Sequence, residues 1–301
     1  MVKRMTVGRM SVVRNGDRYF TIAVDEFGDN SIKGVLFHDS ISGGIIFESL
    51  IEMFSNMDKV FDQLGCPRQT VQERQFSGTE TMIQRTKKSD ETQRRGTLAT
   101  FYVFVQYRYY ASWQGNINWI DKGIKVPFES ERELVLTMNQ FLSGDHKKAQ
   151  ECKVITTCHV AIDSYYSGKV TGNYQNIPSE TVEQQEIPVD LVKSLGNFME
   201  YETSAGDVTK YGINYGQLIS SEACTLCRRG GKLASFSIKV LFREHSTWQG
   251  IIYWREGRQQ QLFRSCKEML YMIASAAEAS AAAAGETKNS KKYHLVTAEF
   301  A

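Results

Sequence analysis

The chain has 301 residues, of which 42% are hydrophobic and 23% are charged, and its formal net charge is +2. This composition is typical of a globular protein with room for two domain-sized cores, and it excludes a disordered chain. The balanced charge argues against a partner bound by bulk electrostatics, such as bulk nucleic acid or an anionic membrane.

The sequence contains no segment typical of export or of membrane insertion. No window approaches the roughly 18 uncharged apolar residues of a spanning helix. The opening MVKRMTVGRM lacks the apolar core of a signal peptide. We therefore expect a cytoplasmic protein without a membrane partner, and in that setting we expect its six cysteines to be free thiols rather than disulfides.

The first predicted module spans about 5–65. Its run RYFTIAVDEFGDNSIKGVLFH, around Asp25, is rich in the β-branched and aromatic residues typical of strands. A helix is predicted in FESLIEMFSNMDKVFDQL, where Ser49 precedes apolar residues that recur at three-to-four-residue spacing. The polar segment 77–96 is predicted to link this module to the next one.

The second predicted module spans about 97–142. The runs FYVFVQYRYY, WQGNINWI and KGIKVPF are separated by turn residues, which predicts three antiparallel strands. A helix follows, with Ser130 as its N-cap and Glu133 three residues later. Both faces of the first strand are apolar, so we expect the modules either to pack sheet to sheet or to join edges into one sheet. A core role for these faces is the first interpretation, and an aromatic platform that stacks bases is the alternative.

The second module recurs later in the chain at one constant offset. Its copy spans about 232–275, and only one residue near Gly231 must be inserted to keep the register. The coincident pairs are Phe101 with Phe236, Trp113 with Trp248, Gly115 with Gly250, Trp119 with Trp254, Phe128 with Phe263, Ser130 with Ser265, and Glu133 with Glu268. Two coincident tryptophans make chance similarity implausible, so the pattern indicates an internal repeat.

A fainter repeat joins the first module to a segment at about 152–200. It places Asp25 opposite Asp163 and Gly34 opposite Gly172. The simplest history is duplication of a two-module unit, which gives a first half at 1–146, a second half at 150–275, and an alanine-rich helix end with a polar tail at 276–301. The predicted fold class is therefore α+β, with four β-β-β-α modules arranged as two similar halves.

The Trp-Gln-Gly motif occurs once in each half. A tryptophan beside an amide can stack on a ligand and hydrogen-bond it, so the candidate contact residues are Trp113, Gln114, Trp248 and Gln249. The structural alternative is that the glycine permits a bulge or a close strand crossing while the tryptophans anchor the core.

Basic turns and paired carboxylates provide the remaining candidates. Arg-Arg-Gly occurs at Arg94 and Arg95 and again at Arg228 and Arg229, so two cationic turns could hold phosphates or an acidic partner, unless they are solvated loops. Asp25 and Asp163 could form a paired carboxylate site across a two-fold axis, although an aspartate that initiates a turn explains the same pattern.

Cys224 and Cys227 have the spacing of half a zinc knuckle. A second pair of ligands is needed, and no standard spacing supplies it, so we expect no metal and no other cofactor. The Gly-rich phosphate loops and the usual nucleophile and metalloprotease motifs are also missing.

The repeated unit, with Trp-Gln-Gly-x-Ile-x-Trp followed by Phe-x-Ser-x-x-Glu, resembles small bacterial proteins that carry one copy of such a module and have no assigned activity. The resemblance covers about 97–142 and 232–275, and it implies a module boundary and a bacterial origin, but no functional residue. The β-β-β-α order also resembles the core of double-stranded RNA-binding domains. Their basic cluster at the start of the last helix is replaced here by Ser-Glu-Arg-Glu and Ser-Cys-Lys-Glu, so topology alone carries that likeness.

These observations favour a non-enzymatic binding or interaction protein over an enzyme. The predicted contact surface is the Trp-Gln-Gly edges together with the Arg-Arg turns, and the sequence leaves open whether its partner is a protein or a nucleic acid. The alternative partner is a nucleic acid or nucleotide held by the same turns and the strand aromatics. An enzyme with its site between the halves is the least favoured interpretation, because it requires Asp25 and Asp163 to line one cleft.

Overall fold

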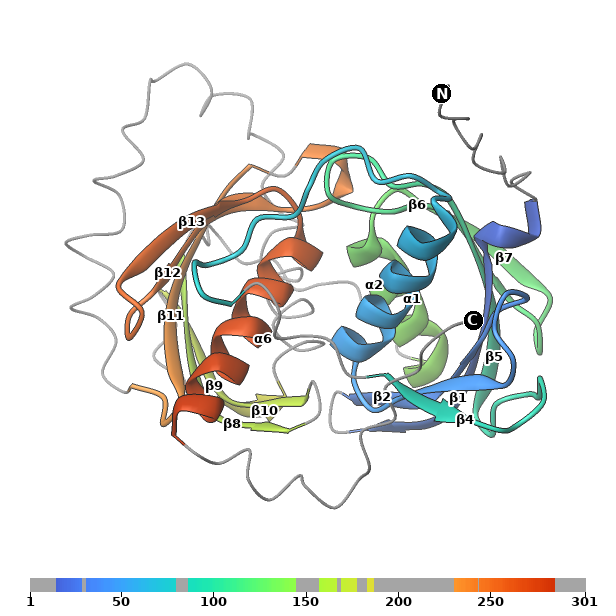
Figure 1. The fold of residues 1–301 in the computed structure, drawn as a ribbon, viewed down its shortest axis with the longest axis horizontal. Coiled ribbons are helices and arrows are strands. Elements are labelled where there is room, and N and C mark those ends of the chain that lie inside the picture. The colour runs from blue at the N-terminus through green and yellow to red at the C-terminus, as the bar shows by residue number, and fades with distance from the viewer. Residues whose placement is uncertain are drawn as a thin grey trace, which may run out of the picture.

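A computed structural model of the chain describes residues 15–28, 31–79, 86–144, 157–166, 169–177, 183–186, 230–242 and 244–284. Within these residues the fold is α+β, with two antiparallel sheets and three α-helices (Figure 1). Two short 3-10 helices, η1 (Asn15–Arg18) and η3 (Glu244–Ser246), complete the described helical elements. The part before residue 145 is called the first half below, and the part after residue 156 the second half.

The first half forms a seven-stranded sheet with the order β4-β3-β2-β1-β5-β6-β7. Its strands are β1 (Tyr19–Gly28), β2 (Ser31–Phe37), β3 (Gly44–Phe47), β4 (Lys87–Ser89), β5 (Ala99–Tyr107), β6 (Gln114–Trp119) and β7 (Ile124–Phe128). Strand β1 pairs with β5 in a register that places Phe20 opposite Val103. The two predicted segments of this half are thus joined edge to edge, the second of the two arrangements that the sequence allowed.

The second half forms a six-stranded sheet with the order β10-β9-β8-β11-β12-β13. Its strands are β8 (Thr157–Tyr166), β9 (Lys169–Ile177), β10 (Glu183–Glu186), β11 (Ala234–Phe242), β12 (Gln249–Trp254) and β13 (Gln259–Phe263). Strands β8 and β11 pair with Val160 opposite Phe236. The central β8–β11 junction therefore corresponds to the β1–β5 junction of the first sheet.

The helices are α1 (Leu50–Leu64), α2 (Glu131–Ser143) and α6 (Cys266–Ala283). Each begins after a serine whose hydroxyl accepts a hydrogen bond from a main-chain N–H three residues later, which satisfies a donor that the first turn leaves free. The donors for Ser130 and Ser265 are the N–H groups of Glu133 and Glu268, at 3.1 and 3.0 Å. The predicted N-caps of α2 and α6 are confirmed.

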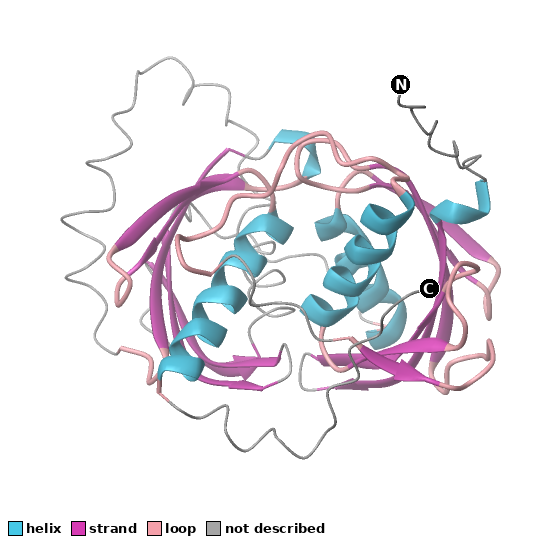
Figure 2. Cartoon of the chain, in the orientation of Figure 1, coloured by secondary structure: helices cyan, strands magenta, loops and turns pink. Residues whose placement is uncertain are grey.

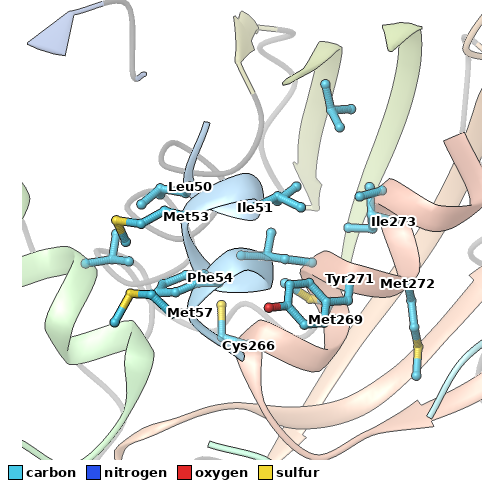
Figure 3. Close-up of a cluster of buried hydrophobic side chains, with 14 of the residues drawn as sticks. Leu50, Ile51, Met53, Phe54, Met57, Cys266, Met269, Tyr271, Met272 and Ile273 are labelled. Carbon is cyan, nitrogen blue, oxygen red and sulfur yellow. The ribbon is translucent and has the colours of Figure 1, made fainter. Parts of the chain in front are cut away.

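The helices lie between the two curved sheets, so each sheet turns one face inward (Figure 2). In β5 the inward Phe101, Val103 and Val105 are fully buried, whereas Tyr102 on the opposite face is exposed. One continuous hydrophobic core includes residues of both sheets and of all three helices. At its centre the apolar sides of α1 and α6 meet, with Phe54 and Met57 on one helix and Met269 on the other (Figure 3).

The prediction of four complete β-β-β-α modules is not shown, because the described residues contain three α-helices. The predicted module at 152–200 contributes β8, β9 and β10, and the rest of its residues lie outside the described part of the chain. The alanine-rich stretch after residue 275 continues α6 as far as Ala283, and Ala276 and Ala277 are fully buried. Small side chains let this helix pack closely against its neighbours.

The segment 66–79, here called the arm, leaves the end of α1 and lies against the second sheet (Figure 1). Ser77 N–H donates to Gln259 Oε1 at 2.8 Å, and the guanidinium of Arg74 donates to the Leu262 carbonyl at 3.3 Å. The arm inserts Phe76, which is fully buried, with its ring centroid 5.5 Å from that of Trp254. The first half thus supplies a core residue to the second.

Candidate functional site

The tryptophans of the Trp-Gln-Gly motifs point into the core. Trp113 is fully buried, and its indole N–H donates to Asp58 Oδ1 at 3.1 Å. Trp248 is also buried, with the guanidinium carbon of Arg132 5.1 Å from its ring centroid. Neither ring offers a face to solvent, so this geometry favours the core-anchor interpretation.

The glycines of the same motifs allow close strand crossings. A Cβ on Gly115 would lie 1.8 Å from the Phe104 carbonyl oxygen, and one on Gly250 would lie 2.0 Å from the Lys239 carbonyl oxygen. The pairing register shifts immediately beyond both positions, between Val105 and Tyr107 and between the equivalent residues of β11. No side chain fits at these two bulged crossings.

The glutamine of the first motif holds a surface turn. Gln114 Oε1 accepts from Tyr109 N–H at 3.1 Å, and its Nε2 donates to the carbonyls of Tyr109 and Glu129 at 3.3 Å each. Gln249 begins β12 at the equivalent position and is half-buried. Gln114 therefore acts on the Tyr109 turn through the main chain.

The two carboxylates predicted as a pair lie in different sheets, and each anchors a turn of its own. Asp25 accepts two hydrogen bonds from Arg94, at 2.8 and 2.7 Å, and one from Thr97 N–H. Asp163 accepts from Lys232 N–H at 3.3 Å. The hydrogen bond from Arg94 is the main reason that the pKa of Asp25 lies below its ordinary value. These contacts suit the turn-initiating role.

The described arginines of the predicted cationic turns form ion pairs. Arg94 pairs with Asp25 and Glu91, both at 2.7 Å, and these hydrogen bonds raise its pKa. The Arg95 side chain is 73% exposed and lies 3.4 Å from Asp121.

The other predicted turn and the cysteine pair lie outside the described residues; they are Arg228, Arg229, Cys224 and Cys227. In the part of the chain that the structure describes, no group of three or more His, Cys, Asp or Glu side chains is arranged to hold a metal ion.

The two halves make reciprocal contacts through equivalent residues. The N-cap hydroxyl of Ser130 donates to the Ser246 carbonyl, and that of Ser265 donates to the Ala111 carbonyl, both at 2.7 Å. In the repeat alignment Ser265 corresponds to Ser130, and Ser246 corresponds to Ala111. Both pairs have the same offset as the aligned tryptophans. A contact that is repeated with its partners exchanged is the geometry of a two-fold axis.

The cations above the two tryptophans are also exchanged between the halves. Lys267 Nζ lies 5.1 Å from the ring centroid of Trp113, and the Arg132 guanidinium lies 5.1 Å from that of Trp248. Arg132 and Lys267 are the second residues after the N-cap serines Ser130 and Ser265, so they occupy matching places in α2 and α6. Each half therefore covers the tryptophan of the other half with a cation.

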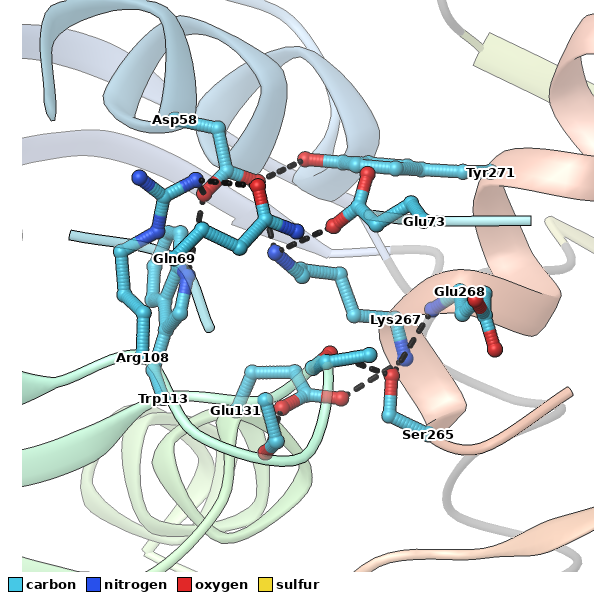
Figure 4. Close-up of polar contacts among 12 residues, drawn as sticks. Asp58, Gln69, Glu73, Arg108, Trp113, Glu131, Ser265, Lys267, Glu268 and Tyr271 are labelled. Atoms are coloured by element: carbon cyan, nitrogen blue, oxygen red, sulfur yellow. Dashed lines mark hydrogen bonds and ion pairs between the residues drawn. The ribbon is translucent and has the colours of Figure 1, made fainter. Parts of the chain in front are cut away.

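A buried group of charges, here called the interhalf ion cluster, surrounds Asp58 of α1 (Figure 4). Asp58 accepts from Arg108 Nη2 at 2.8 Å, from Lys267 Nζ at 2.7 Å and from the Tyr271 hydroxyl at 2.9 Å. Lys267 also pairs with Glu73 of the arm at 2.7 Å. The cluster ties α1, the arm and the end of β5 to α6, and thus the first half to the second.

The protonation states of this cluster suit a structural role. Burial alone would lower the pKa of Lys267, but the negative charges of Asp58 and Glu73 have the larger effect, so the pKa lies above its ordinary value. Burial alone would raise the pKa of Asp58, but the positive charges of Lys267 and Arg108 have the larger effect, so the pKa lies below its ordinary value. Burial and the neighbouring carboxylates raise the pKa of the Tyr271 phenol. The amine and the phenol therefore keep their protons, which leaves no nucleophile among them.

Exposed aromatic rings gather where β5 ends, and they form what is here called the aromatic row: Tyr107, Tyr109, Tyr110 and His245. Tyr107 and Tyr109 stack with centroids 4.9 Å apart, Tyr109 meets Tyr110 edge to face, and Tyr110 stacks on His245 at 3.8 Å. The three tyrosines are 41%, 41% and 51% exposed. Large rings grouped at the surface in this way make this row a candidate contact surface.

The backbone beneath the row is left-handed at residues that are not glycine. The φ angles are +58° at Tyr110 and Ala111, and +55° at His245 and Ser246. Such a conformation is costly for a side-chain-bearing residue, and a bulky tyrosine is a clear outlier. The left-handed residues occupy equivalent positions in the two halves, and Tyr110 of the first half stacks on His245 of the second.

Comparison with protein-family models, curated proteins and solved structures gave no match. The resemblance of the repeated unit to single-module bacterial proteins therefore stays a prediction. None of the described helices has the length and apolar character needed to cross a membrane.

Sequence reasoning missed both the aromatic row and the interhalf ion cluster. The consecutive tyrosines of FYVFVQYRYY were assigned to the strand, whereas β5 ends at Tyr107 and the next residues turn. A signal was present, because Arg108 interrupts the aromatic run with a charge. Arg108 marks the place where the strand stops and its guanidinium turns inward to Asp58.

Proposed function

We propose that the protein is a non-enzymatic binding protein and that the aromatic row is its contact surface. The observation that carries the proposal is the cluster of three exposed tyrosines and His245 on a strained backbone. Tyrosine buries a large area at a contact for little loss of side-chain freedom, and it is enriched at binding interfaces. Gln114 holds the main chain of Tyr109 in place, so little ordering is needed when a partner binds.

We further propose that the chain arose by duplication and comprises four β-β-β-α modules in two similar halves. The reciprocal contacts of Ser130 and Ser265 and the matched strand orders support this history. The aromatic row then lies where the two halves meet, with Tyr110 and His245 as equivalent residues. A binding surface on such a junction exists only when both halves are in place.

The non-enzymatic part of the proposal is supported by the state of the titratable groups. In the interhalf ion cluster the carboxylates of Asp58 and Glu73 pair with Arg108 and Lys267, and none of these four side chains is more than 17% exposed. Asp25 and Asp163 are each engaged in a turn. Acid–base catalysis needs a titratable side chain that is open to a substrate and lies near a second catalytic group. None of these side chains meets both requirements.

A nucleic-acid partner is less well supported. Of the described arginines proposed to hold phosphates, Arg94 is engaged by two carboxylates. Arg94 and Arg95 also precede β5, whereas the aromatic row follows it, and a nine-residue strand separates the two by roughly 30 Å. The aromatic rings that stack on bases and the arginines that pair with phosphates would therefore contact a nucleic-acid strand from opposite ends of the sheet.

The proposal can be tested by selection from random libraries on the full-length protein. Displayed peptides and single-stranded oligonucleotides are enriched in parallel, and enriched binders are measured again on Tyr109→Ala. Tyr102→Ala is the matched control, because Tyr102 is a similarly exposed tyrosine on the outer face of β5. We expect peptides that lose binding to Tyr109→Ala but not to Tyr102→Ala. Enrichment of oligonucleotides alone would favour the alternative partner, and binders indifferent to Tyr109 would refute the proposal.

A further inference from the structure

In the first half, a carboxylate joins the buried indole of the Trp-Gln-Gly motif to the cation above it (Figure 4). Asp58 Oδ1 accepts from the Trp113 indole N–H at 3.1 Å, and Asp58 Oδ2 accepts from Lys267 Nζ at 2.7 Å. The same ammonium group lies 5.1 Å from the centroid of the Trp113 ring. One flat group with two oxygens therefore satisfies the indole donor and neutralises the cation at the same time.

The second half has the same two kinds of donor at the equivalent place. Trp248 is 1% exposed, and its indole N–H is buried and makes no hydrogen bond. The guanidinium carbon of Arg132 lies 5.1 Å from the ring centroid of Trp248, as Lys267 Nζ does from that of Trp113. A buried N–H group without an acceptor is costly, and in native proteins it points to a missing partner.

The described carboxylates that adjoin Arg132 in the chain bind other groups. Glu131 is 1% exposed and accepts from the Ser112 hydroxyl and from the Lys267 N–H. Glu133 accepts from the Glu129 N–H at 2.7 Å. These two carboxylates are therefore held in the first turn of α2 and at its junction with α6.

At the level of sequence, the second repeat replaces Asp58 by a glycine. The register that pairs Gly34 with Gly172 also pairs apolar residues of α1 with apolar residues further along the second half: Phe54 with Val192, Met57 with Leu195, and Val60 with Phe198. In this register Asp58 corresponds to Gly196, which lies outside the described part of the chain and has no carboxylate. The repeat thus keeps the indole and the cation but not the acid that joins them.

We propose that Trp248 and Arg132 bind the carboxylate of a small acid, in the role that Asp58 has in the first half. One oxygen accepts from the Trp248 indole N–H, and the other accepts from the guanidinium. Arginine suits this role because its planar N–H groups match the two oxygens of a carboxylate, and its several donors let it hold an anion beside other partners. A carboxylate carries a single charge, so it costs less to bury than a phosphate dianion. The site joins the halves, because Arg132 belongs to α2 and Trp248 directly precedes β12.

The test follows the indole ¹H–¹⁵N signals of the full-length protein by NMR while sodium acetate replaces sodium chloride at constant ionic strength. The chain has four tryptophans, and each signal is assigned with a Trp→Phe variant. We expect acetate to move the Trp248 signal along a saturable curve, and phosphate at the same ionic strength to move it less. Trp113 is the matched control, because Asp58 already accepts from its N–H. Trp119 and Trp254 control for a general salt effect, since their buried N–H groups also make no hydrogen bond.

Two variants test the cation. Arg132→Met should weaken acetate binding by roughly 10-fold or more, because a hydrogen bond from a charged donor is lost. Arg132→Lys keeps the charge and should weaken binding less. The Trp113 signal reports whether each variant is folded, and if Arg132→Met is not, the comparison is made with Arg132→Lys. Acetate should also raise the melting temperature of the wild type more than that of the variant.

Three outcomes would overturn the proposal. If acetate moves all four indole signals alike, or moves the Trp248 signal equally in the wild type and in both Arg132 variants, Trp248 and Arg132 do not form a site. If acetate leaves the Trp248 signal in place, no carboxylate binds there. If phosphate moves that signal as much as acetate does, the assignment to carboxylates is wrong.

Discussion

Phe76 of the arm should contribute more to stability than any other residue of its loop. Its ring is fully buried and lies against Trp254 and Phe236, at 5.5 and 6.4 Å between centroids. We expect Phe76→Ala to lower the free energy of unfolding by about 3–5 kcal/mol, the range for loss of a buried phenylalanine. Since whole domains are stable by only about 5–15 kcal/mol, the effect should be plain in urea denaturation.

A compensating substitution follows from comparing the halves. In the first half Phe141 of α2 stacks near Phe101 and Trp119, at 6.2 and 5.1 Å, which is the place that Phe76 takes in the second half. The residue of α6 equivalent to Phe141 is Ala276. Ala276→Phe alone should overpack this place and cost about 1–3 kcal/mol.

In the Phe76→Ala background the same substitution should restore stability. We expect a favourable coupling energy of about 1–3 kcal/mol in the double-mutant cycle, because the new ring fills the space that the arm has left. Phe141→Ala, measured in parallel, shows what loss of the equivalent ring costs in the first half. If the Phe76 and Ala276 effects add within about 0.5 kcal/mol, the two rings do not share a site and the reasoning is wrong.

Three other substitutions have outcomes that the structure predicts. Lys267→Met leaves two buried carboxylates without their ammonium partner and should cost about 3–5 kcal/mol in urea denaturation; a loss near zero would show that the ion cluster does not join the halves. Arg94→Ala removes the main cause of the lowered pKa of Asp25 and should cost less than about 1 kcal/mol at neutral pH, since the pair is partly exposed. The pKa of Asp25 is lower in the folded state than in the unfolded state, so the stabilisation by the Arg94–Asp25 pair is present above about pH 4 and is lost as the pH falls further. If the difference in unfolding free energy between the wild type and Arg94→Ala instead grew in acid, the assignment would be contradicted. Gly115→Ala should prevent folding as judged by soluble yield and circular dichroism, because its Cβ would lie 1.8 Å from a carbonyl oxygen, whereas Gly28→Ala meets nothing within 4 Å and should be tolerated.

The elements that the sequence predicted well depend on short-range signals. Ser130 and Glu133 are three residues apart, and a capping hydroxyl needs no tertiary contact to mark the start of a helix. Alternation along β5 also identified a strand, although the pattern alone left open which face lies in the core. The structure resolves this by covering Phe101, Val103 and Val105 with helices.

The features that the sequence did not predict depend on residues far apart in the chain. Lys267 lies 209 positions from Asp58, and nothing local distinguishes either from an ordinary charged residue of an amphipathic helix. The predicted linker, 77–96, covers only the end of the arm, and no element was predicted for 66–76, where Phe76 is a large apolar residue among mostly polar neighbours. The role of the arm becomes visible only when the second sheet is placed beside it.

Tyr110 and His245 occupy matching left-handed backbone positions with different side chains. Two identical subunits around a symmetry axis would have to place the same residue on both sides of that axis, and a ligand lying across it would bind equally well in either direction. A single chain is free of this requirement. At the contact surface proposed above, a partner that crosses the Tyr110–His245 stack would meet a phenol on one side and an imidazole on the other, so the two directions of crossing are not equivalent.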